Sequence, residues 1–241
     1  MKNKEENFLK QQDSANSKSK AGLDEDFLQG EKYLWKVAKA DQQKICEIAN
    51  NYNLSFAVAN VLCSRGLCKK EQIDPFLFPS YERDVTHPSM LKDARKAIDR
   101  IILAIEKKEK ILIFGDYDVD GMTSTSLMMM CLMPLGARVN YFLPNRAVDG
   151  YGLSPKIVRK AAENNYSLVI TVDNGITAFD AAAEAKKLKL DVIVTDHHRQ
   201  SEKLPDFYAV IDPCQDGCKY ACKILAGVGV AFKVLCLLYE K

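Results

Sequence analysis

The sequence predicts an α/β fold: a mostly parallel, five-stranded sheet with helices on both faces, preceded by a small helical region. Short apolar runs alternate with segments of helical periodicity, which is the pattern of consecutive βαβ units. Each run is apolar along most of its length, as expected of strands that are buried on both faces of a parallel sheet. The five runs lie at residues 111–114, 139–143, 168–172, 192–195 and 208–211. Four of them are followed within two residues by an aspartate, which predicts an acidic edge on the sheet.

The segments around these runs predict the helices that cover the sheet. Before the first run, residues 90–108 carry alanine and isoleucine at helical spacing. Further helices are expected at residues 122–133, 155–164, 177–189 and 225–239. The hydroxyl side chains of Thr123, Ser124 and Thr125 are expected to cap the first of these four helices.

The residues ahead of the sheet predict two further parts of the chain. Residues 1–32 are polar and of mixed charge, which predicts a disordered tail. Residues 33–88 form a predicted helical lead-in, in which Asp41 caps a helix and the stretch 75–80 (PFLFPS) is extended. Residues 89–241 then form the main domain.

Composition excludes several classes of protein. The 241 residues are 47% hydrophobic, which is enough for a sizeable core and excludes a globally disordered chain. No run of about 18 apolar residues is present, and the N-terminus has no apolar secretory segment. We therefore expect a cytoplasmic protein with no membrane partner and with reduced cysteines. The spacing of Cys214, Cys218 and Cys222 does not match the usual pairing of zinc ligands.

The loops after the strands carry acids and imidazoles. The first run leads into Gly115–Gly121 (GDYDVDG), and the others are followed by Asp173, by Asp196-His197-His198 and by Asp212. Ligands of parallel sheets bind at the carboxyl ends of the strands, so these side chains are expected to converge. Carboxylates that are buried together repel one another unless cations neutralise them.

This donor set indicates metal-dependent phosphate chemistry. Aspartate oxygens and imidazole nitrogens suit Mn²⁺, Mg²⁺ or Fe²⁺. Two such ions about 3.5–4 Å apart favour in-line displacement at phosphorus. The alternative is a nucleotide-binding or response-regulator-like sheet with a single acidic cluster. Against that alternative, the sequence has no glycine-rich phosphate-binding motif after its first strand.

The same motifs resemble those of the DHH phosphoesterase superfamily. Residues 115–121 (GDYDVDG), 172–176 (VDNGI) and 196–198 (DHH) are similar to its motifs I, II and III. Within the superfamily, the chain resembles the bacterial exonucleases that are specific for single-stranded DNA. The similarity extends from about Trp35 to the end of the chain and includes residues 225–233 (LAGVGVAFK).

The resemblance implies a role for each residue of the site. It makes Asp118, Asp120, Asp173 and His197 the metal ligands, with Asp173 bridging two ions, and the cofactor Mn²⁺ or Mg²⁺. It places Asp116, Asp196 and His198 in the catalytic group, where His198 contacts the scissile phosphate or the bridging water and Asp196 orients the two histidines. Asn145 and Arg146 are the expected substrate contacts, with a surface ion pair as the alternative for Arg146.

The resemblance also implies the activity and its partners. The activity is 5′-to-3′ hydrolysis of single-stranded DNA in repair and recombination, with single-strand-binding or recombination proteins as possible partners. Members of the family continue into a fourth motif, a DHHA1 domain and an OB-fold, so we expect this chain to be the N-terminal portion of a longer enzyme. Asp212 stands where the family usually has an asparagine before proline. The alternatives are a catalytically incomplete fragment or binding module, and a phosphodiesterase of small oligonucleotides or cyclic dinucleotides.

Overall fold

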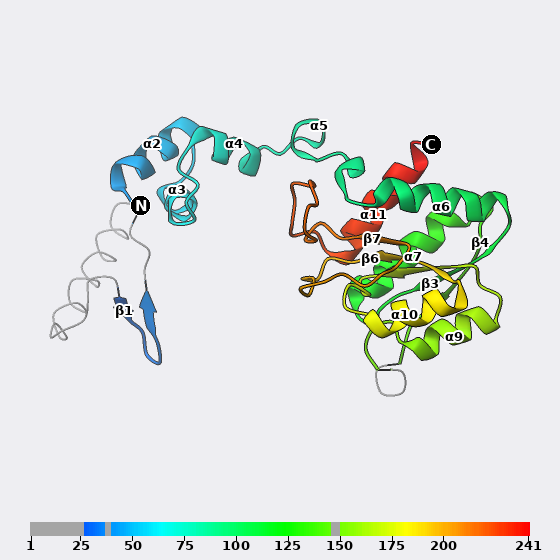
Figure 1. Ribbon diagram of the computed structural model, residues 1–241. Coiled ribbons are helices and arrows are strands. Elements are labelled where there is room, and N and C mark those ends of the chain that lie inside the picture. Colours follow the sequence, from blue (N-terminus) through cyan, green and yellow to red (C-terminus); the bar gives the residue numbers. More distant parts are fainter. Residues whose placement is uncertain (1–26, 37–39, 146–149) are drawn as a thin grey trace. The chain divides into compact units, whose positions relative to one another are not determined.

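A computed structural model describes residues 27–36, 40–145 and 150–241, and Figure 1 follows the chain through its elements. The chain divides into two compact units, one up to Val85 and one from Thr86 to Lys241. The expected tail at residues 1–26 and the expected substrate contact Arg146 lie outside the described residues.

The second unit contains the predicted five-stranded sheet, and all its strand pairs are parallel. The strands run in the order β4-β3-β5-β6-β7. Their bounds are Lys110–Phe114 (β3), Arg138–Phe142 (β4), Leu168–Val172 (β5), Asp191–Thr195 (β6) and Ala209–Ile211 (β7), so each strand begins and ends within one residue of its predicted run. The chain leaves β3 for β4 on one side and later reaches β5 on the other side. Ligands bind at such a switch in strand order, and the acidic loops after β3 and β5 meet there.

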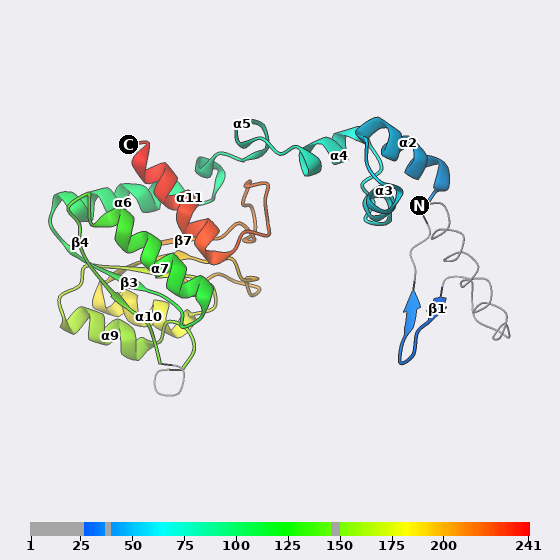
Figure 2. The ribbon, with the colours of Figure 1, turned by 180° about the vertical axis from the view of Figure 1, so that it is seen from behind.

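Helices cover both faces of the sheet, as predicted (Figures 1 and 2). The helices α6 (Ala94–Glu106), α7 (Val119–Leu132) and α11 (Gly227–Tyr239) pack in one hydrophobic cluster with Ile170 and Val172 of β5. The helices α9 (Pro155–Glu163) and α10 (Phe179–Leu188) pack in a second cluster with Val169 of the same strand. Successive residues of a strand point to opposite faces, which explains why β5 is buried along its whole length.

The helix expected at residues 90–108 is shorter in the structure. A single 3-10 turn, η1 (Pro88–Met90), comes first, and α6 begins only at Ala94. Asp93, the residue just before α6, has a φ of 61°, which a right-handed helix cannot contain. The expectation was therefore correct for the apolar stripe of α6 and wrong for its start.

The first unit contains helices α2 (Gln42–Tyr52), α3 (Phe56–Ser64), α4 (Lys70–Leu77) and α5 (Tyr81–Asp84). Asp41 caps α2 as predicted, because its carboxylate accepts the N–H of Gln43 at 2.9 Å. The expected extended stretch at 75–80 is wrong at its start, since Pro75 lies inside α4. Ile73 is only 1% exposed and Asp74 accepts the Tyr52 hydroxyl at 2.6 Å. These tertiary contacts hold the last turn of α4 despite the proline.

A short antiparallel pair precedes these helices. The strands β1 (Phe27–Gln29) and β2 (Leu34–Lys36) place Leu28 opposite Trp35, and the N–H of Gly30 donates to Tyr33 across the turn. The sequence predicts a polar tail up to residue 32 and a helical pattern from residue 33, but residues 27–36 form this antiparallel pair instead. Strands of three residues are too short to show an alternating pattern. No helix in the described part of the chain is long and apolar enough to cross a membrane.

Candidate metal and active site

The loop after β3 carries three of the predicted site residues into the start of α7. Asp118 is the N-cap of α7, where its carboxylate accepts the N–H of Gly121 at 2.9 Å. Gly121 has no room for a side chain, because a Cβ there would lie 2.5 Å from the backbone nitrogen of Asp116. Asp116 is 3% exposed, and its carboxylate accepts the N–H of Tyr117 at 2.6 Å. The tight turn therefore holds the acids of this loop against the end of the sheet.

The predicted hydroxyl caps of α7 are wrong. Thr123, Ser124 and Thr125 donate their hydroxyls to carbonyls of the preceding turn, at 2.7, 2.6 and 2.8 Å. Asp118 already occupies the N-cap position, so these hydroxyls lie one turn too late to reach the free amides.

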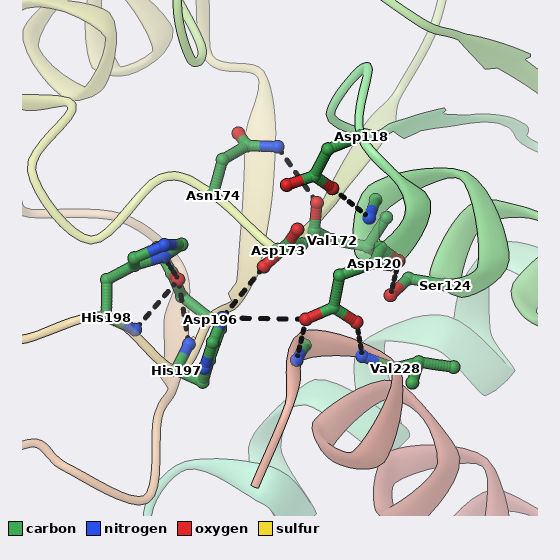
Figure 3. A network of polar contacts seen from close by, with 12 residues as sticks. Asp118, Asp120, Ser124, Val172, Asp173, Asn174, Asp196, His197, His198 and Val228 are labelled. Atoms are coloured by element: carbon green, nitrogen blue, oxygen red, sulfur yellow. Dashed lines mark hydrogen bonds and ion pairs between the residues drawn. The ribbon is translucent and has the colours of Figure 1, made fainter. Parts of the chain in front are cut away.

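Asp120 connects this loop to the last helix. One oxygen of its carboxylate accepts the N–H of Gly227 and the other accepts the N–H of Val228, both at 2.7 Å (Figure 3). These are the first amides of α11, which have no acceptor within the helix, and a carboxylate is stabilised by the positive end of a helix dipole. The contact spans more than a hundred residues of sequence, and no local pattern predicts it.

Asp173 lies at the centre of the cluster, directly after β5. Its φ is 63°, a left-handed conformation that is rare for a residue other than glycine and that marks functional sites. The side chain is buried, and within the described part of the chain its Oδ1 accepts no hydrogen bond, although Nε2 of His197 lies 3.0 Å away. Burial, together with the carboxylates of Asp120 and Asp118, raises the pKa of Asp173 to about 7.

Asp196 holds the two histidines that follow it. Its Oδ1 accepts the N–H of His197 at 2.7 Å and lies 2.7 Å from Nδ1 of His198 (Figure 3). Its Oδ2 accepts the N–H of Ile176 at 2.9 Å. Burial acts to raise the pKa of Asp196, but the hydrogen bonds from His198 and from backbone amides bring it below its ordinary value. The contact with Asp196 raises the pKa of His198 to about 9.

The structure brings most of the predicted site together. Ligand atoms of Asp173, His197 and His198 all lie within 4.8 Å of one another. Asp120 joins them, because its Oδ2 lies 3.6 Å from Nε2 of His197. Asp118 lies close enough to Asp173 to raise its pKa. Asn145, a predicted substrate contact, is exposed in the loop after β4.

These residues fit a divalent cation. The Oδ1 of Asp173 is a buried acceptor without a donor, and other carboxylates disfavour its ionisation. Carboxylate oxygens and imidazole nitrogens are the ligands that Mn²⁺ and Mg²⁺ take in proteins. A cation at Asp173 would satisfy the free oxygen and offset the repulsion between the acids.

Two residues near the cluster were not predicted as site residues. Asp212, after β7, is fully buried, and its Oδ2 accepts no hydrogen bond within the described part of the chain. Burial raises the pKa of Asp212 to about 7. Burial and the carboxylates of Asp116 and Asp196 raise the pKa of Tyr151 to about 12. The sequence places Tyr151 between two glycines, Gly150 and Gly152, and in the structure both have positive φ.

Comparison with known proteins agrees with this geometry. Residues 110–241, which include the whole cluster, match the model of the DHH family, N-terminal domain. The chain belongs to the DHH family. Its relatives within the family include the single-stranded-DNA-specific exonuclease RecJ of Bacillus subtilis, which is 43% identical over 203 residues, or 84% of this chain and 26% of the relative. RecJ of Thermus thermophilus is 34% identical over 179 residues, or 73% of this chain and 25% of the relative.

Solved structures of DHH proteins show the same fold. The structure of RecJ from Thermus thermophilus in complex with Mn²⁺ aligns with a TM-score of 0.64 at 29% identity, over 85% of this chain and 28% of that one. A structure of exonuclease RecJ bound to manganese aligns with a TM-score of 0.58 at 36% identity, over 62% of this chain and 38% of that one. The chain spans about a quarter of the length of the curated relatives it matches.

Proposed function

We propose that this DHH chain is the metal-holding part of a phosphodiesterase that hydrolyses single-stranded DNA. The observation that carries the proposal is the cluster of Asp120, Asp173, His197 and His198, whose acids need a cation. The relatives supply the substrate class, since they are named as exonucleases specific for single-stranded DNA.

The residues that would hold the metal follow from the contacts. Asp173 offers an oxygen without a hydrogen bond, and His197 offers Nε2 next to it. Asp118 and Asp120 complete the set, with each carboxylate already oriented by backbone amides. A divalent ion held there lowers the pKa of a coordinated water and stabilises charge on phosphate oxygens.

His198 is placed to meet the substrate. Asp196 engages Nδ1 of His198, so Nε2 is the nitrogen that remains for a phosphate oxygen. The side chain of His198 is 46% exposed, whereas that of Asp196 is 1% exposed. Asp196 is thus a positioning residue, and His198 presents a donor and, below a pKa of about 9, a positive charge to the phosphate.

We also propose the direction and setting of the activity. Removal of nucleotides from the 5′ end, in repair and recombination within the cytoplasm, is what the likeness to the RecJ exonucleases favours. Asn145 and Arg146 remain proposed contacts for the DNA backbone.

The test is Mn²⁺-dependent release of mononucleotides from a 5′-labelled single strand by the full-length protein. Asp173→Asn removes the charge and keeps a residue that tolerates a positive φ. We expect it to lower the rate at least about 100-fold, because losing a residue that merely orients a metal ligand already costs about 10–100-fold. Asp206→Asn is the matched control, because its carboxylate is 77% exposed and pairs with Lys186. Unchanged activity in Asp173→Asn would exclude the proposed site.

A second candidate is a module that binds metal without turnover. The cluster supports it, because Asp173, His197 and His198 could hold an ion without any contact to a substrate. Titration of the 241-residue chain with Mn²⁺, next to an activity assay on the same preparation, separates the two candidates. Binding of Mn²⁺ without release of nucleotides would support the binding module. Faster turnover of a dinucleotide than of a long single strand would instead indicate a phosphodiesterase of small oligonucleotides.

A further inference from the structure

A cavity opens beside the metal cluster on the α9–α10 face of the sheet. It has a volume of about 630 Å³ and reaches Asp196 and His198 at its inner end. Its walls come from the loop that enters α9, residues 151–155, and from the loop that enters α10, residues 175–181. Sites for small organic ligands have volumes of about 300–1,000 Å³, so a nucleoside fits.

The walls of the cavity are mostly uncharged in the described part of the chain. No Lys or Arg lines the cavity in the described part of the chain, and two of its lining residues are acids, Asp180 and Asp196. Apart from these acids and His198, the wall is apolar or carries a hydroxyl, as at Leu153, Ile176 and Thr177. Such a wall suits an uncharged ring with a few polar edges rather than an anion.

Two aromatic side chains line this cavity and are exposed. Tyr151 is 60% exposed and Phe179, the first residue of α10, is 41% exposed. Gly150 and Gly152, with φ of 80° and 73°, hold the backbone on both sides of Tyr151 in a conformation that other residues rarely adopt. Exposed aromatic rings at a cavity mouth mark ligand contacts, and they stack on nucleobases without regard to sequence.

We propose that this cavity takes one nucleoside of the DNA strand, with its base against Tyr151 and Phe179 and the neighbouring phosphate at His198. The inference rests on the proposed function and adds a base subsite to it. It also separates the two parts of a nucleotide: the anionic part goes to the metal cluster, and the neutral part goes to the cavity.

The first experiment measures binding without catalysis. Thymidine and inorganic phosphate are titrated separately into the 241-residue chain, with NMR detection. We expect Phe179→Ala and Tyr151→Ala to weaken thymidine binding about tenfold and to leave phosphate binding within twofold. The matched controls are Phe232→Ala and Tyr141→Ala, because these rings are 45% and 60% exposed and lie outside the cavity.

The second experiment uses cleavage by the full-length protein. A series of single DNA strands, each with one abasic site at a different position, is compared with the intact strand. For one of these positions, we expect the wild type to cleave the abasic strand about tenfold more slowly than the intact strand. Phe179→Ala should cleave the same two strands at rates that differ less than about twofold. A preference that is equal in the two proteins, or absent from both, would overturn the subsite. If the wild type cleaves neither strand, the proposed function fails, and the thymidine titration still decides the subsite.

Discussion

The two ends of the sheet both gather charged side chains, but they neutralise them differently. At the amino end, Arg100 is 7% exposed and lies between Glu109, at 2.8 Å, and Asp191, at 2.6 Å. It also donates to the carbonyl of Ser167 at 3.2 Å. The acids of that end therefore have a cation from the chain itself.

At the carboxyl end, the His198 imidazole carries a positive charge next to Asp196, but the described residues place no Lys or Arg beside Asp120 and Asp173. In the described part of the chain, Asp120, Asp173 and Asp196 contact backbone amides and imidazoles rather than Lys or Arg. Burial and mutual repulsion raise the pKa of Asp173 to about 7. The amino end of the sheet is therefore stabilised by ion pairs within the chain. At the carboxyl end, ionisation of Asp173 depends on a cation from outside the chain.

The largest expected effect is at the amino end. Arg100→Met should lower the free energy of unfolding by about 3 kcal/mol, because it leaves two acids without their partner. Arg159→Met is the control, since that side chain is 51% exposed and its single ion pair is worth less than about 1 kcal/mol. Urea denaturation measures both, and equal effects would contradict the distinction between the ends.

Adding a cation should act on the carboxyl end alone. With Mn²⁺ at about one hundred times its Kd, the wild type should gain about 2.7 kcal/mol of stability. Asp173→Asn should gain far less, and Arg100→Met should gain as much as the wild type. Thermal unfolding with Mn²⁺ and with chelator measures the difference. A full gain in Asp173→Asn would place the cation elsewhere.

Removing an uncompensated acid should stabilise the metal-free protein. Asp212 has a pKa of about 7 in the fold, so the folded state loses stability relative to the unfolded chain as pH rises from about 4 to 7. Asp212→Asn does not ionise and so avoids this loss of stability, but it buries an amide that needs hydrogen-bond partners. We expect a net gain of about 2 kcal/mol in the free energy of unfolding at pH 8. The gain should vanish near pH 4 in urea denaturation. Weaker binding of Mn²⁺ in this variant would instead make Asp212 a ligand.

The sequence allowed prediction of one end of the sheet better than the other. The carboxyl end was predictable because each acid follows its own apolar run, and parallel strands bring those loops together. The ion pairs of Arg100 were not predictable from the sequence, because the partner Asp191 lies 91 residues away. Arg100 also lies in α6, where the apolar stripe predicts a helix and gives no indication of a buried ion pair. Pro75 in α4 and the bonds of Asp120 to α11 were missed for the same reason: tertiary contacts decide them.

The smallest effect tests how closely α11 must approach the acids. A Cβ at Gly227 would lie 2.6 Å from Oδ1 of Asp173, whereas at Gly229 it would meet only Leu225, at 3.5 Å. Gly227→Ala should therefore cost about 1 kcal/mol and weaken Mn²⁺ binding, because the Asp120 carboxylate and the free Asp173 oxygen both shift. Gly229→Ala, in the same helix, should be neutral or stabilising by up to about 1 kcal/mol and leave the Kd for Mn²⁺ unchanged. Equal Kd values in the two variants would mean that the acids tolerate movement of α11, and that the carboxyl end is less tightly built than its contacts imply.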